Sequence, residues 1–197
     1  MDFQKPLTDD QLVEMYLQGS GAAFDELLAR YQDKLYTYIL YNVHNEDAAN
    51  DIFQETFVRA ITTLQQGRYT SSGRFYAWLV RIARNHIIDR FRTLRGENAI
   101  SNDECEYDLL NDVTLADQPI ETQMVNEQTL IDVRRLMDHL PESQREVVFL
   151  RFFQDLSFKE IAETTGVGIN TALGRMRYAV LNMRRMAEEN NISLFVA

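Results

Sequence analysis

The chain has few of the cysteines and histidines that cross-link small secreted domains, and few of the glycines and prolines that form their turns. Its 197 residues include one cysteine, Cys105, and three histidines. One cysteine cannot form an internal disulfide, and three scattered histidines do not complete a zinc site around it, so a disulfide-stapled module is excluded. Eight glycines and three prolines are few for a loop-rich all-β or repeat protein.

The chain also lacks the patterns that direct a protein to a membrane. No uncharged apolar run of about 18 residues is present, so we expect no membrane insertion. The first residues show no basic segment followed by an apolar run, as a signal peptide would. We therefore expect a cytoplasmic protein.

Motifs of catalysis are missing as well. None of the three lysines follows a glycine, which leaves no Gly-x-x-x-x-Gly-Lys phosphate loop, and Gly166 with Gly168 does not complete a dinucleotide-binding motif. His44, His86 and His139 have no Glu or His partner at helical metal-ligand spacing. We predict no catalytic residue, no metal site, no cofactor and no enzymatic activity.

Positive charge is scarce overall but concentrated. The net charge is −10, yet residues 68–95 carry seven arginines and one aspartate, whereas residues 96–133 carry ten acids and no lysine or arginine. Of the 20 basic residues 17 are arginines, whose planar guanidinium grips phosphates and base edges. The distribution favours nucleic-acid binding, which the net charge alone would argue against.

Apolar residues recur every three or four positions along most of the chain, which predicts helices. Four amphipathic helices are expected before residue 96, the first opened by a capping box at Thr8–Gln11 and the third capped by Asn45. Residues 97–120 are acidic with weak periodicity, and we interpret them as a flexible linker. Helical pattern resumes near Glu121.

The second half is predicted to hold a helix-turn-helix. A helix is expected over 142–153, a capping box at Ser157–Glu160 opens a short helix, and Asn170 is expected to cap the last long helix. No strand pattern is visible. The fold class is therefore all-α, with two small helical domains, 1–96 and 121–197, joined by the acidic linker.

Three segments are candidates for function. The last helix gathers Arg175, Arg177, Arg184 and Arg185, which favours DNA binding, with a helical hairpin whose arginines are merely solvated as the alternative. Residues 71–95 interleave aromatics with arginine, as in the core of a bundle or on a surface that stacks single-stranded bases.

The third candidate lies in residues 45–61. Asp47, Asp51 and Glu55 recur at four-residue spacing beside an apolar stripe. This pattern is either a solvated acidic face or a docking surface for a basic partner helix.

Taken in chain order, the three segments resemble the extracytoplasmic-function type of bacterial sigma factor, group 4 of the sigma-70 family. DIFQETF (51–57) is similar to the family's polymerase-docking helix, and GRFYAWLVRIARNHIIDRFR (73–92) to its −10 helix. Residues 140–185 are similar to its −35 domain. The resemblance spans residues 7–95 and about 121–187, so the first domain resembles sigma region 2 and the second region 4.

The resemblance implies a promoter-specificity factor that directs core RNA polymerase to DNA and helps to open it. Its expected partners are core polymerase (the β′ clamp and the β flap), promoter DNA and an anti-sigma factor. The polymerase-binding role would fall to Asp47, Asp51, Ile52, Gln54, Glu55 and Phe57. The −10 element would be bound by Arg68, Tyr69, Arg74, Phe75, Tyr76, Trp78, Arg81, Arg84 and Asn85, of which Asn85 matches the family's melting residue. The −35 element would be bound by Asn170, Thr171, Leu173, Gly174, Arg175, Arg177 and Tyr178.

The sequence departs from the family at Leu173 and Gly174, where many members carry a basic residue and serine. These two residues cannot donate side-chain hydrogen bonds to base edges. The DNA sequence of the −35 element that the protein would read therefore does not follow from the resemblance. An ordinary helix-turn-helix regulator, or an interaction scaffold with a degenerate DNA domain, stays an alternative. The acidic linker is either a solubilising tether or a mimic of nucleic acid in a positively charged channel.

Overall fold

The computed structural model describes residues 6–95, 127–190 and 192, and within these every regular element is a helix. The expected linker 97–120, and Cys105 with it, lies outside the described residues. The helices are α1 (Asp9–Leu17), α2 (Gly21–Val43), α3 (Glu46–Gln65), α4 (Phe75–Arg95), α5 (Glu127–Asp138), α6 (Glu142–Phe152), α7 (Phe158–Thr165) and α8 (Ile169–Glu189). The prediction of an all-α fold is confirmed.

Local side chains set where several helices begin. The Thr8 side chain accepts from the backbone N–H of Gln11 while the Gln11 side chain accepts from the Thr8 N–H, and Ser157 with Glu160 repeats the arrangement at α7. These reciprocal bonds satisfy N–H groups that a helix start leaves unpaired. Asn45 caps α3 by accepting from the Ala48 N–H. All three caps confirm the sequence predictions.

The prediction that Asn170 caps the last helix was wrong. Gly168 holds the N-cap position in an extended conformation, and α8 begins at Ile169 with no side-chain cap bond, so Asn170 lies inside the first turn. Gly166 ends α7 with a left-handed φ of +75°, which costs glycine little because it has no Cβ. The turn between α7 and α8 is therefore two residues shorter than the capping pattern indicated.

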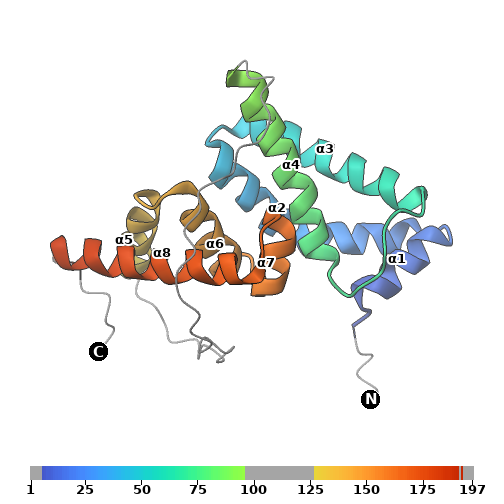
Figure 1. Cartoon of the computed structure of the whole chain (residues 1–197). Coiled ribbons are helices and arrows are strands. Elements are labelled where there is room, and N and C mark those ends of the chain that lie inside the picture. Colours follow the sequence, from blue (N-terminus) through green and yellow to red (C-terminus); the bar gives the residue numbers. More distant parts are fainter. Residues whose placement is uncertain (1–5, 96–126, 191, 193–197) are drawn as a thin grey trace.

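Helices α1–α4 form one bundle and α5–α8 a second, and the buried apolar residues of the two form one continuous cluster. In the first, Leu35, Ile39, Ala60 and Leu79 are fully buried. The two bundles also pack on each other, with α7 against the first half of α4 (Figure 1). This closed arrangement, meaning the packing of the first bundle on the second, determines which functional side chains are accessible.

Candidate functional site

The exposed face of α3 is acidic. Asp47, Asp51, Gln54 and Glu55 are all exposed. Two further residues expected to dock polymerase lie in the core instead: Ile52 is buried, and the Phe57 ring packs edge-on against Phe24 at 6.2 Å and Phe53 at 5.0 Å between centroids. They hold α3 on the bundle, while the carboxylates point to solvent.

Sequence reasoning missed one apolar residue on that face. Val58 follows Asp51 by seven residues and Glu55 by three, so the three share one face of α3. Val58 is 58% exposed. The face therefore offers carboxylates and one apolar contact to a partner.

The loop of residues 66–73 lies between α3 and α4 and exposes Arg68, Thr70 and Ser71. Tyr69 alone turns inward. Its ring lies 4.7 Å from that of Trp78 and 5.9 Å from that of Phe75 between centroids. Burial, with the Asp10 and Asp9 carboxylates, raises the pKa of Tyr69 to about 12, so its hydroxyl stays protonated at neutral pH. Tyr69 therefore fixes the loop on α4 while its neighbours face outward.

The aromatic residues of α4 divide between core and surface. Phe75 is buried, so in this conformation it supports the bundle and offers no stacking face. Trp78 is half-buried, while Arg81 and Asn85 are exposed. An accessible strip of α4 therefore runs from the 66–73 loop past Trp78 to Asn85.

Two other residues of α4 expected at DNA, and Arg74 directly before the helix, contact the second bundle instead. Arg84 donates two bonds to Glu146, from Nε at 2.6 Å and Nη2 at 3.1 Å. Arg74 pairs with Glu163 at 2.6 Å. The hydroxyl of Tyr76 donates to the side-chain oxygen of buried Gln154.

The closed arrangement has contacts beyond α4. Lys34 on α2 pairs with Asp155 at 2.6 Å. The ring of Tyr41 stacks on that of Phe149, with 4.2 Å between centroids and 14° between planes. An offset aromatic stack of this kind contributes about 0.5–1.5 kcal/mol beyond area burial. The two bundles are thus joined by ion pairs around an apolar and hydrogen-bonded centre.

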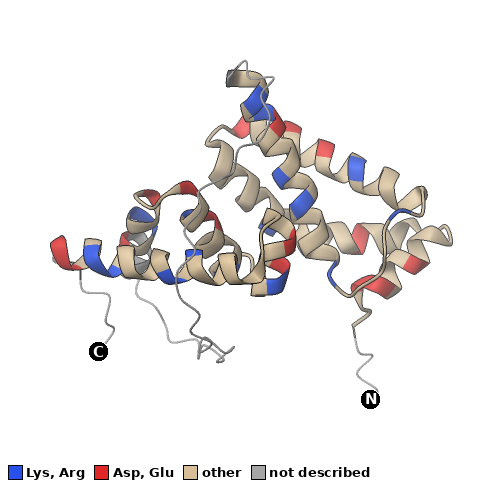
Figure 2. Cartoon of the chain, viewed as in Figure 1, with Lys and Arg blue, Asp and Glu red and all other residues tan. Residues whose placement is uncertain are grey.

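Helix α8 presents the second basic surface, and Figure 2 shows basic residues along both α4 and α8. Asn170, Thr171, Arg177 and Tyr178 are exposed, as the DNA prediction requires, whereas Leu173, Gly174 and Arg175 are partly covered. A Cβ added at Gly174 would meet no atom within 4 Å. There is therefore free space beside the backbone of α8 at Gly174.

The sequence prediction omitted one residue of this surface. Leu181 follows Arg177 by four positions on α8 and is 50% exposed. Arg184 and Arg185 continue the exposed side one turn later. The spacing of three and four residues from Asn170 could have identified this face.

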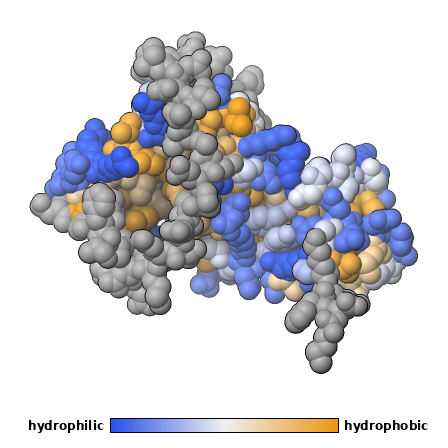
Figure 3. All heavy atoms as spheres, turned by 90° about the horizontal axis from the view of Figure 1, so that it is seen from below, coloured by the Kyte–Doolittle hydropathy of each residue, from blue (hydrophilic) through white to orange (hydrophobic). Residues whose placement is uncertain are grey.

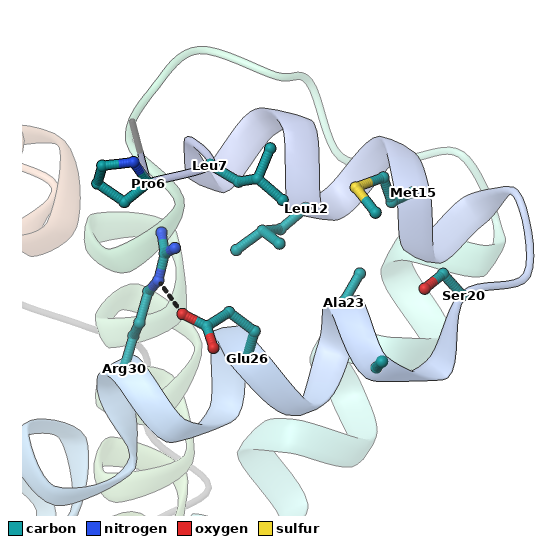
Figure 4. A pocket seen from close by; sticks show the side chains of 9 residues that line it. Pro6, Leu7, Leu12, Met15, Ser20, Ala23, Glu26 and Arg30 are labelled. Carbon is teal, nitrogen blue, oxygen red and sulfur yellow. Dashed lines mark hydrogen bonds and ion pairs between the residues drawn. The ribbon is translucent and has the colours of Figure 1, made fainter. Parts of the chain in front are cut away.

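A pocket of about 310 Å³ between α1 and α2 is lined mainly by apolar residues, with Arg30 paired to Glu26 at 3.0 Å on its wall (Figure 4). The hydrophobic residues visible from below form separate patches bordered by hydrophilic ones (Figure 3). Across the described helices and loops, no cluster of three His, Cys, Asp or Glu could hold a metal ion. In that same part of the chain, no helix is long and apolar enough to cross a membrane.

Two family models match the chain, each on one bundle. Residues 27–97 match sigma-70 region 2, and residues 130–174 match sigma-70 region 4. The first match contains α3, the 66–73 loop and α4, and the second contains the helix-turn-helix up to the first turns of α8.

Curated relatives align along most of the chain. RNA polymerase sigma-H factor of Pseudomonas aeruginosa is 32% identical, over 85% of this chain and 88% of its own. ECF RNA polymerase sigma-E factor of Haemophilus influenzae is 31% identical, over 92% and 94%. ECF RNA polymerase sigma factor BldN of Streptomyces coelicolor is 36% identical, over 79% and 57%.

Solved structures share the fold at lower identity. CnrH, solved with the cytosolic domain of CnrY, has a TM-score of 0.62 at 23% identity and covers 92% of this chain and 97% of its own. RpoE of Bartonella quintana, solved with the anti-sigma factor NepR, has a TM-score of 0.58 at 18% identity, over 84% and 96%. With both regions in order and relatives above 30% identity along its length, the chain belongs to the extracytoplasmic-function group of the sigma-70 family of RNA polymerase sigma factors.

Proposed function

We propose that this sigma factor, which directs RNA polymerase to specific promoters, divides the task among three faces. The acidic face of α3, with Asp51, Glu55 and Val58, docks on a basic helical surface of core polymerase in the cytoplasm. The 66–73 loop and the exposed strip of α4 bind the −10 element. Helix α8 binds the −35 element. One observation supports this proposal: α3, α4 with its preceding loop, and α8 each expose side chains to solvent, and each lies wholly or partly in one of the two matched regions.

Opening of the −10 duplex is assigned to the loop and to Asn85. The Asn85 amide is exposed on α4, where it can pair with a base edge once that base has left the stack. Unstacking costs a few kcal/mol, and capture of a base by stacking and hydrogen bonds offsets that cost. Binding energy alone therefore drives local opening, and the protein acts as an initiation factor rather than as an enzyme.

Full promoter contact requires the closed arrangement to open. Arg74 and Arg84 cannot hold Glu163 and Glu146 while they contact phosphates, and Tyr76 is covered by the second bundle. We propose that core polymerase separates the bundles and that an anti-sigma factor is a further partner. The structural neighbour RpoE was solved with the anti-sigma factor NepR, and CnrH with the cytosolic domain of CnrY.

The α3 assignment is tested by charge reversal. Asp51→Lys with Glu55→Lys should lower affinity for core polymerase at least tenfold, since complementary charges at an interface contribute about 1.5 kcal/mol or more when closely paired. Asp25→Lys with Asp33→Lys changes the net charge equally, on exposed positions of α2, and serves as the control. Equal core affinity for both double variants in a titration would remove the α3 docking face from the proposal.

A further inference from the structure

The first turn of α1 carries two acids with different partners. Asp9 ties α1 to α2, because it accepts from Arg30 at 3.1 Å and from the Tyr31 hydroxyl. Asp10 turns the other way, to the 66–73 loop, where its Oδ2 accepts from the backbone N–H of Gly73 at 2.9 Å. Asp10 therefore connects α1 to a segment more than sixty residues further along the chain.

A second polar group of the loop adjoins the same carboxylate. The Tyr69 hydroxyl and the Asp10 Oδ1 atom are both buried, and among the described residues these are the two buried side-chain atoms without a hydrogen-bond partner. Burial raises the pKa of Tyr69, and the neighbouring Asp10 carboxylate raises it further. Because buried polar groups in proteins are almost always hydrogen-bonded, we expect the Tyr69 hydroxyl to donate to the Asp10 Oδ1 atom.

Asp10 thus reaches the loop at two points. Tyr69 lies near its middle, and Gly73 closes it with a left-handed φ of +69°. Between them, Thr70, Ser71 and Ser72 are exposed. Fixing both ends of this short stretch sets the shape that its outward-facing groups present.

We propose that Asp10 is a positioning residue for −10 recognition, which holds the 66–73 loop in the form that accepts an unstacked base. The inference rests on the proposed role of that loop. Asp10 itself does not touch DNA. A loop that is ordered before binding does not lose its conformational freedom at the moment of capture, so affinity for the single strand rises.

The substitutions separate the hydrogen bonds from the charge. Asp10→Ala removes both contacts to the loop, whereas Asp10→Asn keeps an oxygen for the Gly73 N–H and places an amide beside the Tyr69 hydroxyl. Glu14→Ala is the matched control, because Glu14 is an exposed acid on α1 whose carboxylate accepts from Gln18 on the same helix.

The measurement uses reconstituted holoenzyme and a promoter that the wild type transcribes. The affinity of the holoenzyme is titrated for a single-stranded oligonucleotide that carries the non-template −10 sequence of that promoter. The titration is repeated with oligonucleotides in which one base is replaced. We expect Asp10→Ala to weaken cognate binding about tenfold, as for the loss of one charge-assisted hydrogen bond, and to flatten the base preference. The affinity of Asp10→Asn for the cognate strand should lie within about threefold of the wild-type affinity, and that of Glu14→Ala should equal the wild-type affinity.

The outcomes separate this inference from the proposed function. If wild-type holoenzyme shows no base preference on the −10 strand, the loop assignment fails and the role of Asp10 with it. If wild type discriminates and Asp10→Ala does so equally well, the loop keeps its function and the positioning role is wrong. If Asp10→Ala lowers core affinity and duplex −35 binding as much as −10 binding, Asp10 is only a structural residue of the bundle.

Discussion

The ion pair between Arg84 and Glu146 should control how far the two bundles separate. It is the least exposed pair between them, with side-chain exposures of 20% and 14%. Lys34–Asp155, by contrast, exposes 34% and 79%. Since exposed pairs contribute about 0–1 kcal/mol, the covered, two-bonded pair is the one whose loss should be measurable.

The expected magnitude follows from the geometry. Hydrogen bonds to charged groups contribute about 1.5–3 kcal/mol, and Glu146→Ala removes the two that Arg84 donates to Glu146. Glu146→Ala should therefore shift the equilibrium from closed to open about 10- to 150-fold. Alanine is the best helix former, so α6 (Glu142–Phe152) should remain intact. Arg84, which we propose contacts promoter DNA, is unchanged in this variant.

Two measurements report the shift. Dyes at Val58→Cys and Glu188→Cys, on a Cys105→Ser background, follow the separation of the bundles by energy transfer; both positions are exposed. Affinity of the free protein for the −10 single strand should rise with the open fraction and reach a plateau when that fraction is near one. Glu142→Ala, on the same helix and exposed, is the control.

One result would refute the reasoning directly. If Glu146→Ala has the same energy transfer and the same single-strand affinity as wild type and Glu142→Ala, the ion pair does not hold the bundles together. A fall in helicity by circular dichroism would instead indicate damage to α6. In that case Glu146→Gln, which keeps the size and one hydrogen bond, should give a smaller opening of the same sign.

Two further predictions concern the DNA-facing helices. Asn85→Ala should leave core binding near normal and reduce open complex, measured as permanganate reactivity of −10 thymines, and a pre-melted bubble should bypass most of the defect because unstacking is already done. Equal defects on duplex and bubble would assign Asn85 to capture instead. Gly174→Ala should raise the free energy of unfolding by up to about 1 kcal/mol, since the new methyl meets no atom within 4 Å, yet weaken −35 duplex binding if the backbone approaches DNA there. Unchanged −35 affinity would show that the helix stands clear of the groove at this position.

The helices could be predicted because their signals are local. A capping box such as Thr8–Gln11 or Ser157–Glu160 places donor and acceptor within one turn, so four residues of sequence contain the whole interaction. The start of α8 shows the limit of this reasoning. Gly168 serves as N-cap through its backbone carbonyl alone, so a better capping side chain two residues later was a misleading signal.

The roles of individual side chains in α4 could be predicted only in part. Interleaved arginines and aromatics left a bundle core and a base-stacking surface both open, and helical spacing alone did not separate buried Phe75 from half-buried Trp78. The partner of Tyr76 is Gln154, 78 residues away in the chain. The contact of Asp10 with Gly73 spans 63 residues. Such contacts depend on how whole bundles pack, which no local pattern specifies.

Under the proposed function, Arg84 of α4 and Arg74 just before it have two mutually exclusive sets of partners, the carboxylates of the second bundle and DNA. Arg74 and Arg84 face carboxylates of the second bundle at 2.6 Å, the same kind of contact that a guanidinium makes with phosphate oxygens. If these arginines bind the −10 element as proposed, Glu163 and Glu146 occupy the positions that DNA phosphates would take. Because both pairings need the same guanidinium groups, separation of the bundles and binding of the −10 element are thermodynamically linked, and any partner that holds the bundles apart raises promoter affinity by the same factor as DNA raises the affinity for that partner.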